Sequence, residues 1–295
     1  MRQRRYYPLI YLILVLAFTV YIFLDTFVIS KSYQTVAVVT ANNSTEVAAD
    51  STDDSETTVT TQTSITISTD HQYDSDFYVA DIVLGENDSI YTALAENTYG
   101  SNITETTSSI AESVGATLAI NGDFYGVQSE GYVIRNGELL RSTMKSSDQE
   151  DLVIYEDGTM DIVQEGDITA EALVENGAYN VLSFGPGLVE DGEISVESTD
   201  EEDNARTLLN PRTAIGQISE DHYVFVVVDG RTDESTGVSL SELATFMQSL
   251  GCTEAYNLDG GGSSTLYYNG EVLNNPTTNG KTFEEREVSD IVYIF

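Results

Sequence analysis

Apolar and polar residues divide the 295-residue chain into three stretches of different character. An uncharged, mainly apolar run extends from Tyr6 to Leu24 and continues beyond Asp25 to Ile29. About 20 apolar residues are needed to cross a bilayer, whereas the apolar part of a cleaved signal peptide is usually about 7–15 residues long. We therefore expect residues 1–30 to form a basic cytoplasmic tip and an uncleaved transmembrane signal anchor.

The residues around the apolar run indicate its orientation. Arg2, Arg4 and Arg5 precede it, and positively charged flanks stay on the cytoplasmic side of a membrane. The nearest small-residue cleavage pattern, Val-Thr-Ala at 39–41, lies far downstream. The expected location is the cell membrane, with a single span and the C-terminal domain outside the cell.

Polar residues dominate the second stretch, from Ser30 to about Asp76. Its Ser, Thr and Asp residues follow no hydrophobic period, and the stretch has little apolar surface to bury. We predict that residues 31–76 form a disordered stalk that holds the folded domain away from the membrane.

The third stretch, residues 77–295, has the patterns of a folded domain. Continuous runs of apolar and β-branched residues predict strands at 78–84, 90–94, 117–120, 223–228 and 255–258. Pairs of a polar residue and glycine predict hairpin turns at Asn136-Gly137, Asp157-Gly158, Asp191-Gly192 and Asn269-Gly270. Short helices are expected at 103–114 and 171–176.

One stronger helix follows the run at 223–228. Ser239 and Glu242 have the spacing of a capping box, and Gly251 stops the helix. One face of it carries Leu240, Leu243, Ala244, Met247 and Leu250. Hairpins interleaved with this strand–helix–strand unit predict an α+β (mixed α/β) domain with mixed sheets, several β-hairpins and few helices, plus one N-terminal transmembrane helix.

Charge and residue scarcity narrow the function. The chain has 12 Lys and Arg against 49 Asp and Glu, a formal net charge of −37. Phosphate backbones need clustered cations, so nucleic acid is not an expected partner. The two histidines, His71 and His222, argue against a histidine-rich zinc site and a Ser-His-Asp triad. The single Cys252 is expected to be a small buried side chain.

Three predicted strands end in a short polar cluster. These clusters are Asn121-Gly122-Asp123, Asp229-Gly230-Arg231 and Asp259 to Ser264. Strand ends present polar side chains to a crevice, and one helix joins the second cluster to the third. We expect the strands before Asp229 and Asp259 to be neighbours whose carboxylates open onto a common cleft. An Asp-Gly pair after a strand is often only a turn, but three such ends favour a functional site.

The glycine loop and two arginines suit an anion. The loop Gly260-Gly261-Gly262-Ser263-Ser264 lets the backbone approach a ligand, and its N–H groups are expected to form an anion-binding nest; the alternative is a flexible hairpin connector. Arg212 and Arg231 stand in motif-like positions, and arginine binds phosphate oxygens bidentately. The alternative for each arginine is a salt bridge to one of the many carboxylates.

Five separated motifs resemble, in the same order, those of the phosphodiester glycosidase domain family, which includes the lysosomal uncovering enzyme and bacterial exopolysaccharide-related homologues. They are Asn121-Gly122-Asp123-Phe124-Tyr125, Gly185-Pro186-Gly187-Leu188, Asn210-Pro211-Arg212-Thr213-Ala214-Ile215-Gly216, Val228-Asp229-Gly230-Arg231 and Asn257-Leu258-Asp259-Gly260-Gly261-Gly262-Ser263-Ser264. The resemblance runs from about Leu118 to the C-terminus. It implies hydrolysis of a sugar-1-phosphodiester to a free sugar and a phosphomonoester. Many relatives differ at Asn210, so no catalytic role is carried onto it.

Cleavage of an anomeric C–O bond normally uses two carboxylates. The catalytic candidates are therefore Asp123, Asp229 and Asp259. They are candidates for the roles of base, nucleophile and sugar-hydroxyl ligand, and the sequence does not assign a particular role to any one of them. Phosphate is a good leaving group, so arginine and backbone N–H groups can stabilise its charge in place of a strong acid. The substrate-binding candidates are Asn121, Arg212, Arg231, Asn257, Gly260, Gly261, Gly262, Ser263 and Ser264. The expected partner is a sugar-1-phosphodiester or a phosphate-containing envelope glycan.

The sequence requires no cofactor. Carboxylates grouped without histidine are also ligands of the type that Ca²⁺ and Mg²⁺ prefer, so a divalent cation is compatible with the three clusters. Two other functions stay open at this point. One is a non-catalytic module that binds envelope carbohydrate or phosphopolymer, which would not need all three aspartates. The other is a phosphodiesterase that cuts P–O, which usually requires a metal cluster.

Overall fold

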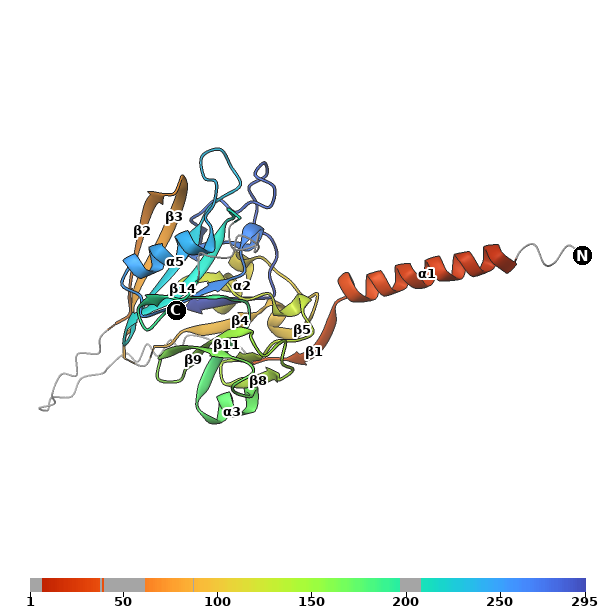
Figure 1. Cartoon of the computed structure of the whole chain (residues 1–295), viewed down its shortest axis with the longest axis horizontal. Coiled ribbons are helices and arrows are strands. Elements are labelled where there is room, and N and C mark those ends of the chain that lie inside the picture. The colour runs from red at the N-terminus through yellow and green to blue at the C-terminus, as the bar shows by residue number, and fades with distance from the viewer. Residues whose placement is uncertain (1–6, 38, 40–61, 87, 197–207) are drawn as a thin grey trace, which may run out of the picture.

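One long helix projects from a body of antiparallel sheets in the computed structural model, which describes residues 7–37, 39, 62–86, 88–196 and 208–295 (Figure 1). The helix α1 (Tyr7–Phe27) leaves the body on the side of β1 (Lys31–Thr35) and β5 (Thr98–Ser101). Its segment Ile10–Phe27 is apolar and none of it is buried in the protein. By length and composition this helix is sufficient to cross a membrane.

The largest sheet has seven strands and positions most of the predicted site. Its order is β13-β12-β16-β14-β15-β3-β2, with bounds Glu193–Ile194, Gly187–Glu190, Glu254–Leu258, Arg212–Ser219, His222–Val228, Ser75–Val83 and Ser64–Gln72. Both faces of β15 are covered, as its continuous apolar run predicted. Val224 and Val226 pack toward α5 (Leu240–Ser249), whereas Phe225 and Val227 pack toward the other sheets.

Two five-stranded sheets complete the body. One has the order β18-β17-β6-β19-β4, with bounds Glu271–Val272, Leu266–Tyr268, Leu118–Asn121, Asp290–Ile294 and Tyr91–Leu94, and it packs against α2 (Thr107–Val114). The other has the order β10-β9-β11-β7-β8, with bounds Met160–Gln164, Glu150–Tyr155, Ala178–Leu182, Val133–Arg135 and Glu138–Arg141, and it packs against α3 (Ala170–Glu175). The part of the chain that the structure describes also contains the short 3₁₀ turns η2 (Ala95–Asn97), η3 (Tyr125–Val127) and η4 (Gly261–Ser263).

Most of the predicted elements are confirmed. Each of the four polar-glycine pairs lies at a hairpin turn, and all of their residues except Asp157 have positive φ. The helix α5 has the complete capping box between Ser239 and Glu242. The helix α2 is shorter than expected because Thr106 caps it, accepting a hydrogen bond from the N–H of Ser109.

The predicted stalk is wrong at both of its ends. Residues 31–35 form β1, which pairs with β5, and residues 64–72 form β2, which pairs along its whole length with β3. Ile65 and Ile67 alternate with polar residues and pack against the main core, a period-two pattern that a search for continuous apolar runs missed. The sheet therefore begins before Phe77, and the middle of the predicted stalk, 40–61, lies outside the described residues.

The predicted pairing of the strands before Asp229 and Asp259 is also wrong. The strand β14 lies between β15 and β16 and forms antiparallel ladders with both. The helix α5 therefore crosses over one intervening strand. Asp229 and Asp259 still lie at the same end of the sheet. This is because β15 and β16 run in the same direction on either side of β14, so that their C-terminal ends point the same way.

Candidate active site

Two of the three polar strand ends meet through direct contacts. Asn121 ends β6, and its Nδ2 donates to the carbonyl oxygen of Asp259 at 2.6 Å. The N–H of Asp259 donates to the carbonyl of Gly122 at 3.3 Å. Asn121 Oδ1 accepts from Thr213 Oγ1 at 2.8 Å, which ties β6 to β14. Asn121 is fully buried, and its amide holds the strand ends together from inside the protein.

The carboxylate of Asp259 forms a cluster with Ser263 and Arg286, which we call the Asp259 cluster. Asp259 Oδ2 accepts from Ser263 Oγ at 2.7 Å and from Arg286 Nη2 at 2.7 Å. Arg286 Nε donates to Ser263 Oγ at 2.8 Å, so the three side chains form a closed triangle. The side chain of Arg286 is 38% exposed and that of Asp259 is 11% exposed, so the cluster borders solvent.

The surroundings of Asp259 act on the pKa of its carboxyl in opposite directions. Burial raises the pKa of the Asp259 carboxyl above its ordinary value, while the Arg286 charge and the Ser263 hydroxyl oppose part of that rise. A carboxyl group with a raised pKa transfers protons more effectively near neutral pH than an ordinary one. The cluster therefore places a carboxyl group suited to acid–base chemistry beside a permanent positive charge.

Asp229 is held by the loop that follows β18. Its Oδ1 accepts from Asn274 Nδ2 at 3.0 Å, and its Oδ2 accepts from Asn275 Nδ2 at 3.0 Å. The N–H of Asn275 donates to the same carboxylate at 3.0 Å. Burial, and then the charge of Asp229, raise the pKa of the neighbouring Tyr78 to about 12. Among the described residues no hydrogen bond joins Asp229 to Asp259, and Asp229 fastens this loop to the end of β15.

Close packing explains the glycines that follow Asp259. Gly261 has φ +64°, and a Cβ there would lie 2.8 Å from Arg231 Nη2. A Cβ at Gly262 would lie 2.2 Å from Thr278 Oγ1. A larger residue at Gly262 would therefore press on Thr278, and one at Gly261 would adopt a strained backbone conformation and push the Arg231 side chain aside.

The backbone of this loop is not the open nest that we expected. The N–H groups of Gly261, Ser263 and Ser264 donate within the protein, to the carbonyl oxygens of Pro211, Gly260 and Gly261 at 2.9, 3.3 and 3.3 Å. The N–H groups of Ser263 and Ser264 are bonded within the 3₁₀ turn η4, and that of Gly261 is bonded to the segment before β14. The contribution of the loop is to hold Ser263 against Asp259 and to lie against Arg231.

Arg231 is exposed and sits beside the glycine loop. Its Nη1 donates to the carbonyl of Thr278 at 2.8 Å, and its Nη2 donates to Asn210 Oδ1 at 3.1 Å. Within the described part of the chain it forms no ion pair with a carboxylate. Among these residues, then, the salt bridge that was the alternative for Arg231 is not formed.

Arg212 lies behind Arg231 at the start of β14. Its Nε donates to the carbonyl of Val238 at 3.1 Å, and its Nη2 donates to the carbonyl of Leu208 at 3.0 Å. Burial, and then repulsion from Arg231, lower the pKa of Arg212 to about 10. Arg212 and Arg231 are thus close enough for their charges to interact.

Asp123 lies in a second, internal cluster, which we call the Arg135 cluster. Arg135 Nη2 donates to Asp123 Oδ2 at 2.8 Å and to Asp290 Oδ2 at 2.7 Å. Asp123 also accepts from the N–H groups of Ser183 and Tyr125 at 2.9 and 3.0 Å. The side chains of both aspartates are 0% exposed. In this structure Asp123 therefore does not reach the surface that the Asp259 cluster borders.

Two buried polar atoms near the glycine loop are unpaired. Asn257 Nδ2 donates to the carbonyl of Gly185 at 2.8 Å, beside the cis peptide bond between Gly185 and Pro186. Asn257 Oδ1 and Ser264 Oγ have no hydrogen-bond partner among the described residues. Buried polar atoms of this kind are uncommon and frequently mark a place that water or a ligand occupies.

The described residues contain no group of three or more His, Cys, Asp or Glu arranged to hold a metal ion. The carboxylate oxygens of the predicted site are instead engaged by arginine, serine and asparagine, as given above for Asp123, Asp229 and Asp259. A divalent cation therefore has no set of converging carboxylates in this conformation.

Sequence reasoning missed three residues that organise the two clusters: Arg286, Arg135 and Asp290. Arg286 stands in an acidic run, Glu284-Glu285-Arg286-Glu287, that resembles an ordinary solvated segment. Scarcity was the available signal, because each of the 12 cations in a chain of this charge is informative. Asp290 begins an apolar strand, which gave no sign of a partner at Arg135.

Curated relatives match more than half of the chain. N-acetylglucosamine-1-phosphodiester alpha-N-acetylglucosaminidase of Bos taurus is 30% identical over 179 residues, covering 55% of this chain and 33% of that protein. The SPbeta prophage-derived uncharacterized protein YomE of Bacillus subtilis (strain 168) is 32% identical over 182 residues, covering 60% of this chain and 28% of that protein. The chain thus spans about a third or less of the length of these relatives.

A solved structure has the same fold. It is the catalytic domain of zebrafish N-acetylglucosamine-1-phosphodiester alpha-N-acetylglucosaminidase (NAGPA), auto-inhibited by its pro-peptide. The TM-score is 0.63 at 21% identity, with 90% of this chain and 87% of that chain covered. The model of the NAGPA phosphodiester glycosidase family matches residues 114–295. Since this match covers more than half of the sequence, the chain belongs to the NAGPA phosphodiester glycosidase family.

Proposed function

We propose that this protein hydrolyses the glycosidic C–O bond of sugar-1-phosphodiesters and releases a free sugar and a phosphomonoester. The observation that carries the proposal is the Asp259 cluster, a carboxyl group with a raised pKa that borders solvent beside two further arginines. Family membership supports the reaction type, and the mammalian relatives are named for N-acetylglucosamine-1-phosphodiesters. Such diesters are the first substrates to test.

In the proposed reaction Asp259 acts at the anomeric carbon or on the attacking water. An oxocarbenium-like transition state gains positive charge, which a nearby carboxylate stabilises. Arg286 and Ser263 hold Asp259 Oδ2 in place, so little reorganisation is needed when charge develops. Asp259 is therefore assigned as the catalytic carboxylate, and Ser263 and Arg286 as its positioning residues.

Arg231, with Arg212 behind it, is assigned to the phosphate. The guanidinium group of Arg231 is exposed, and among the described residues its hydrogen bonds go to neutral oxygens only. A departing phosphomonoester gains negative charge, and arginine stabilises such charge with bidentate hydrogen bonds. This charge stabilisation replaces the strong general acid that a poorer leaving group requires.

Asp229 and Asp123 are assigned to positioning. Asp229 fastens the loop of Asn274 and Asn275, and the Arg135 cluster holds Asp123 on the chain that follows Asn121. These assignments leave Asp259 as the one of the three aspartates that contacts substrate. No cofactor enters the proposed reaction.

The helix α1 is proposed to anchor the protein in the cell membrane, with the domain on the outer side. Its apolar length and the basic residues before it support this orientation. The substrate would then be a phosphate-containing glycan of the cell envelope.

Hydrolysis of methyl N-acetylglucosamine-1-phosphodiester in ¹⁸O-labelled water tests the reaction directly. Mass spectrometry of the products is expected to find the label in the sugar, because the C–O bond is cut. Label in the phosphate instead would replace the proposal with a phosphodiesterase. Absence of turnover across a panel of sugar-1-phosphodiesters, with the Asp259→Asn variant as the blank, would favour a binding module.

A further inference from the structure

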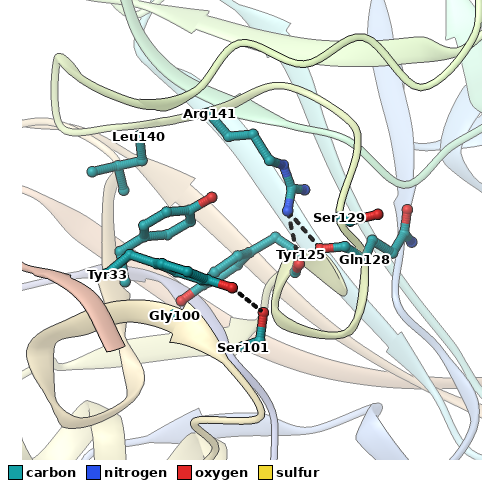
Figure 2. A pocket seen from close by; sticks show the side chains of 9 residues that line it. Tyr33, Gly100, Ser101, Tyr125, Gln128, Ser129, Leu140 and Arg141 are labelled. Atoms are coloured by element: carbon teal, nitrogen blue, oxygen red, sulfur yellow. Dashed lines mark hydrogen bonds between the residues drawn. The ribbon is translucent and has the colours of Figure 1, made fainter. Parts of the chain in front are cut away.

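A pocket of about 350 Å³ lies apart from the Asp259 cluster, beside the junction of α1 and the domain (Figure 2). Its lining consists of Tyr33, Tyr99, Gly100, Ser101, Tyr125, Gln128, Ser129, Leu140 and Arg141. We call it the Tyr33 pocket. None of the residues assigned above to catalysis or to phosphate lines it, so it requires a separate explanation.

Three tyrosines form a ladder through the Tyr33 pocket. The ring of Tyr33 lies 5.7 Å from that of Tyr99, and the ring of Tyr99 stacks on Tyr125 at 5.4 Å with an interplanar angle of 20°. Tyr125 is buried, whereas Tyr33 is 62% exposed. The ladder thus presents an exposed aromatic ring that is supported from behind, and such rings are typical of ligand sites.

The position of Tyr33 depends on an irregularity in the short sheet. The ladder between β1 and β5 shifts register between Ser32 and Gln34, so Tyr33 is the residue without a paired partner. Bulges of this kind redirect a side chain and are frequent next to binding sites. Gly100 permits the approach of β1, because a Cβ there would lie only 2.0 Å from the carbonyl oxygen of Lys31. The lack of a side chain at Gly100 in β5 therefore allows β1, which carries Tyr33, to pack closely against β5.

Arg141 provides the charge of the pocket. Its Nη1 donates to the carbonyl oxygens of Tyr125 and Gln128 at 3.1 and 2.7 Å, as Figure 2 shows, and its Nε donates to the carbonyl of Gly131 at 2.6 Å. Within the described ranges it forms no ion pair with a carboxylate. Its guanidinium is held by backbone carbonyls and also interacts with the Tyr99 hydroxyl, where its charge and hydrogen bond oppose the rise in the pKa of Tyr99 that burial causes.

The lining of the Tyr33 pocket contains no acidic residue, although the chain has 49 Asp and Glu, and its one charged group is Arg141. The adjoining pocket, which shares Tyr33 with it, includes Asp25, and the charge of Asp25 is paired with Lys31 at 2.8 Å. A third surface pocket has a contrasting composition: it is formed by Tyr155, Glu156, Asp157, Thr159, Asn176 and Gly177 and so pairs a tyrosine with two carboxylates. An anion is repelled by this acidic pocket and attracted by the Tyr33 pocket.

We propose that the Tyr33 pocket binds a pyranose that carries an anionic group such as a phosphate. The apolar C–H face of the sugar packs on the ring of Tyr33, and the anionic group pairs with Arg141. The polar side chains of Ser101, Gln128 and Ser129 supply hydrogen bonds to sugar hydroxyls. The pocket stands independently of the hydrolysis proposed above, because it uses none of the same residues.

The absence of tryptophan from the chain allows a direct test. In the full-length Tyr33→Trp variant in detergent, selective excitation reports on this pocket alone, whatever happens at the Asp259 cluster. Glucose 6-phosphate, which has no sugar-1-phosphodiester bond to hydrolyse, is expected to change the emission saturably. Glucose and inorganic phosphate are each expected to bind about tenfold more weakly or worse, since each lacks one of the two contacts.

Two matched controls separate specific binding from general effects. The Tyr155→Trp variant places the reporter in the acidic pocket and is expected to show no saturable change with glucose 6-phosphate. Ser129→Asp adds a carboxylate at an exposed lining position, whereas Ser129→Asn adds nearly the same volume without the charge. Titrations of these two variants by ligand-observed NMR are expected to show about tenfold weaker binding of glucose 6-phosphate to the first alone.

The proposal is overturned if glucose 6-phosphate gives no saturable signal in the folded Tyr33→Trp variant and none by NMR in the unsubstituted chain. It is equally overturned if the Tyr155→Trp variant responds in the same way, or if Ser129→Asp binds as tightly as Ser129→Asn. Loss of hydrolysis in the Asp259→Asn variant with intact binding here would show that the two sites are separate.

Discussion

The Asp259 cluster and the Arg135 cluster both join arginine to aspartate, but they differ in their access to solvent. In the Arg135 cluster the arginine side chain is 1% exposed and both carboxylates are 0% exposed. In the Asp259 cluster the arginine side chain is 38% exposed and the carboxylate 11%. The first holds strands together, and the second is the one to which we assign the catalytic role. In that proposal burial, rather than residue type, separates the structural carboxylates from the catalytic one.

The buried cluster also supports the exposed one. Arg135 holds Asp123, and the two residues before Asp123 hold the backbone of Asp259: the side-chain amide of Asn121 donates to its carbonyl, and the carbonyl of Gly122 accepts from its N–H. Burial, and then the charge of Asp123, raise the pKa of Asp290, while the ion pair with Arg135 opposes the rise. One arginine thus compensates two carboxylates that repel each other, and removing it leaves both without a cation.

Arg135→Met is expected to have the largest effect of any change in the two clusters. It leaves two buried carboxylates without a cation, and breaking a buried ion pair in this way costs about 3–5 kcal/mol in the free energy of unfolding. Urea denaturation of the variant measures the loss, with Glu138→Gln on the adjacent exposed strand as the control. A variant as stable as the unsubstituted protein would show that the Arg135 cluster is not structural.

Asp259→Asn is expected to lower kcat by about 10²–10³ while leaving the unfolding midpoint nearly unchanged. The substitution keeps the size of the side chain but removes the charge that stabilises the transition state. Asp233→Asn, at an exposed position in a neighbouring loop, is the matched control. Near-normal kcat in Asp259→Asn, with Asp229→Asn inactive, would transfer the catalytic role to Asp229.

Arg231→Lys sharpens the assignment of the phosphate site. Lysine keeps the charge but loses the planar fork, so we expect roughly a tenfold loss in kcat/KM for phosphodiesters. Lys281→Arg, an exchange in the opposite direction at an exposed position, is expected to leave kcat/KM unchanged. Equal kinetics for the Arg231→Lys variant and the unsubstituted protein would remove Arg231 from the phosphate site.

The smallest expected effect concerns pH and Asp151, a buried aspartate in β9. Burial, and then the nearby carboxylates of Glu165 and Asp123, raise its pKa from 3.8 to about 8. Because the pKa is higher in the folded state than in the unfolded state, Asp151 contributes stability below about pH 4 that is lost as pH rises toward about 8. Asp151→Asn removes this dependence.

At pH 8 the Asp151→Asn variant is therefore expected to melt above the unsubstituted protein, and at pH 4 the two melting temperatures are expected to be nearly equal. Calorimetry at both pH values measures the difference. Asp148→Asn, at an exposed position nearby, provides the comparison and is expected to shift neither melting temperature. A shift of the same size at both pH values would assign the effect to packing rather than to titration.

Local patterns predicted much of this fold because they depend on nearest neighbours. The hairpin turns require residues that adopt positive φ, and the cap of α5 depends on a spacing of three residues. The position of β14 between β15 and β16 could not be predicted in this way, because strand order is a long-range property. The strand β2 could not be predicted in this way either. Its alternating apolar residues are explained only by its pairing with β3.

The candidate site could be predicted where the residues in contact belong to the same sequence motif. Asp259 and Ser263 are four residues apart and their contact follows from the loop. Arg286 reaches them from a segment more than 20 residues later, and no periodicity connects the two. Asp123 carried the same local signal as Asp259, and what separates them is the presence of Arg135 from another sheet.

The docking of β1 onto β5 limits how far the domain reaches from its anchor. Three residues join α1 to β1, and at about 3.3–3.6 Å per residue they span at most about 11 Å. Asn102 holds this connection closer to the domain, because its Nδ2 donates to the carbonyls of Thr26 and Ile29 at 3.2 Å each. If α1 spans a bilayer, as proposed above, this short connection would keep the domain close to the headgroups. Encounters with the proposed substrate would then depend on lateral diffusion along that surface.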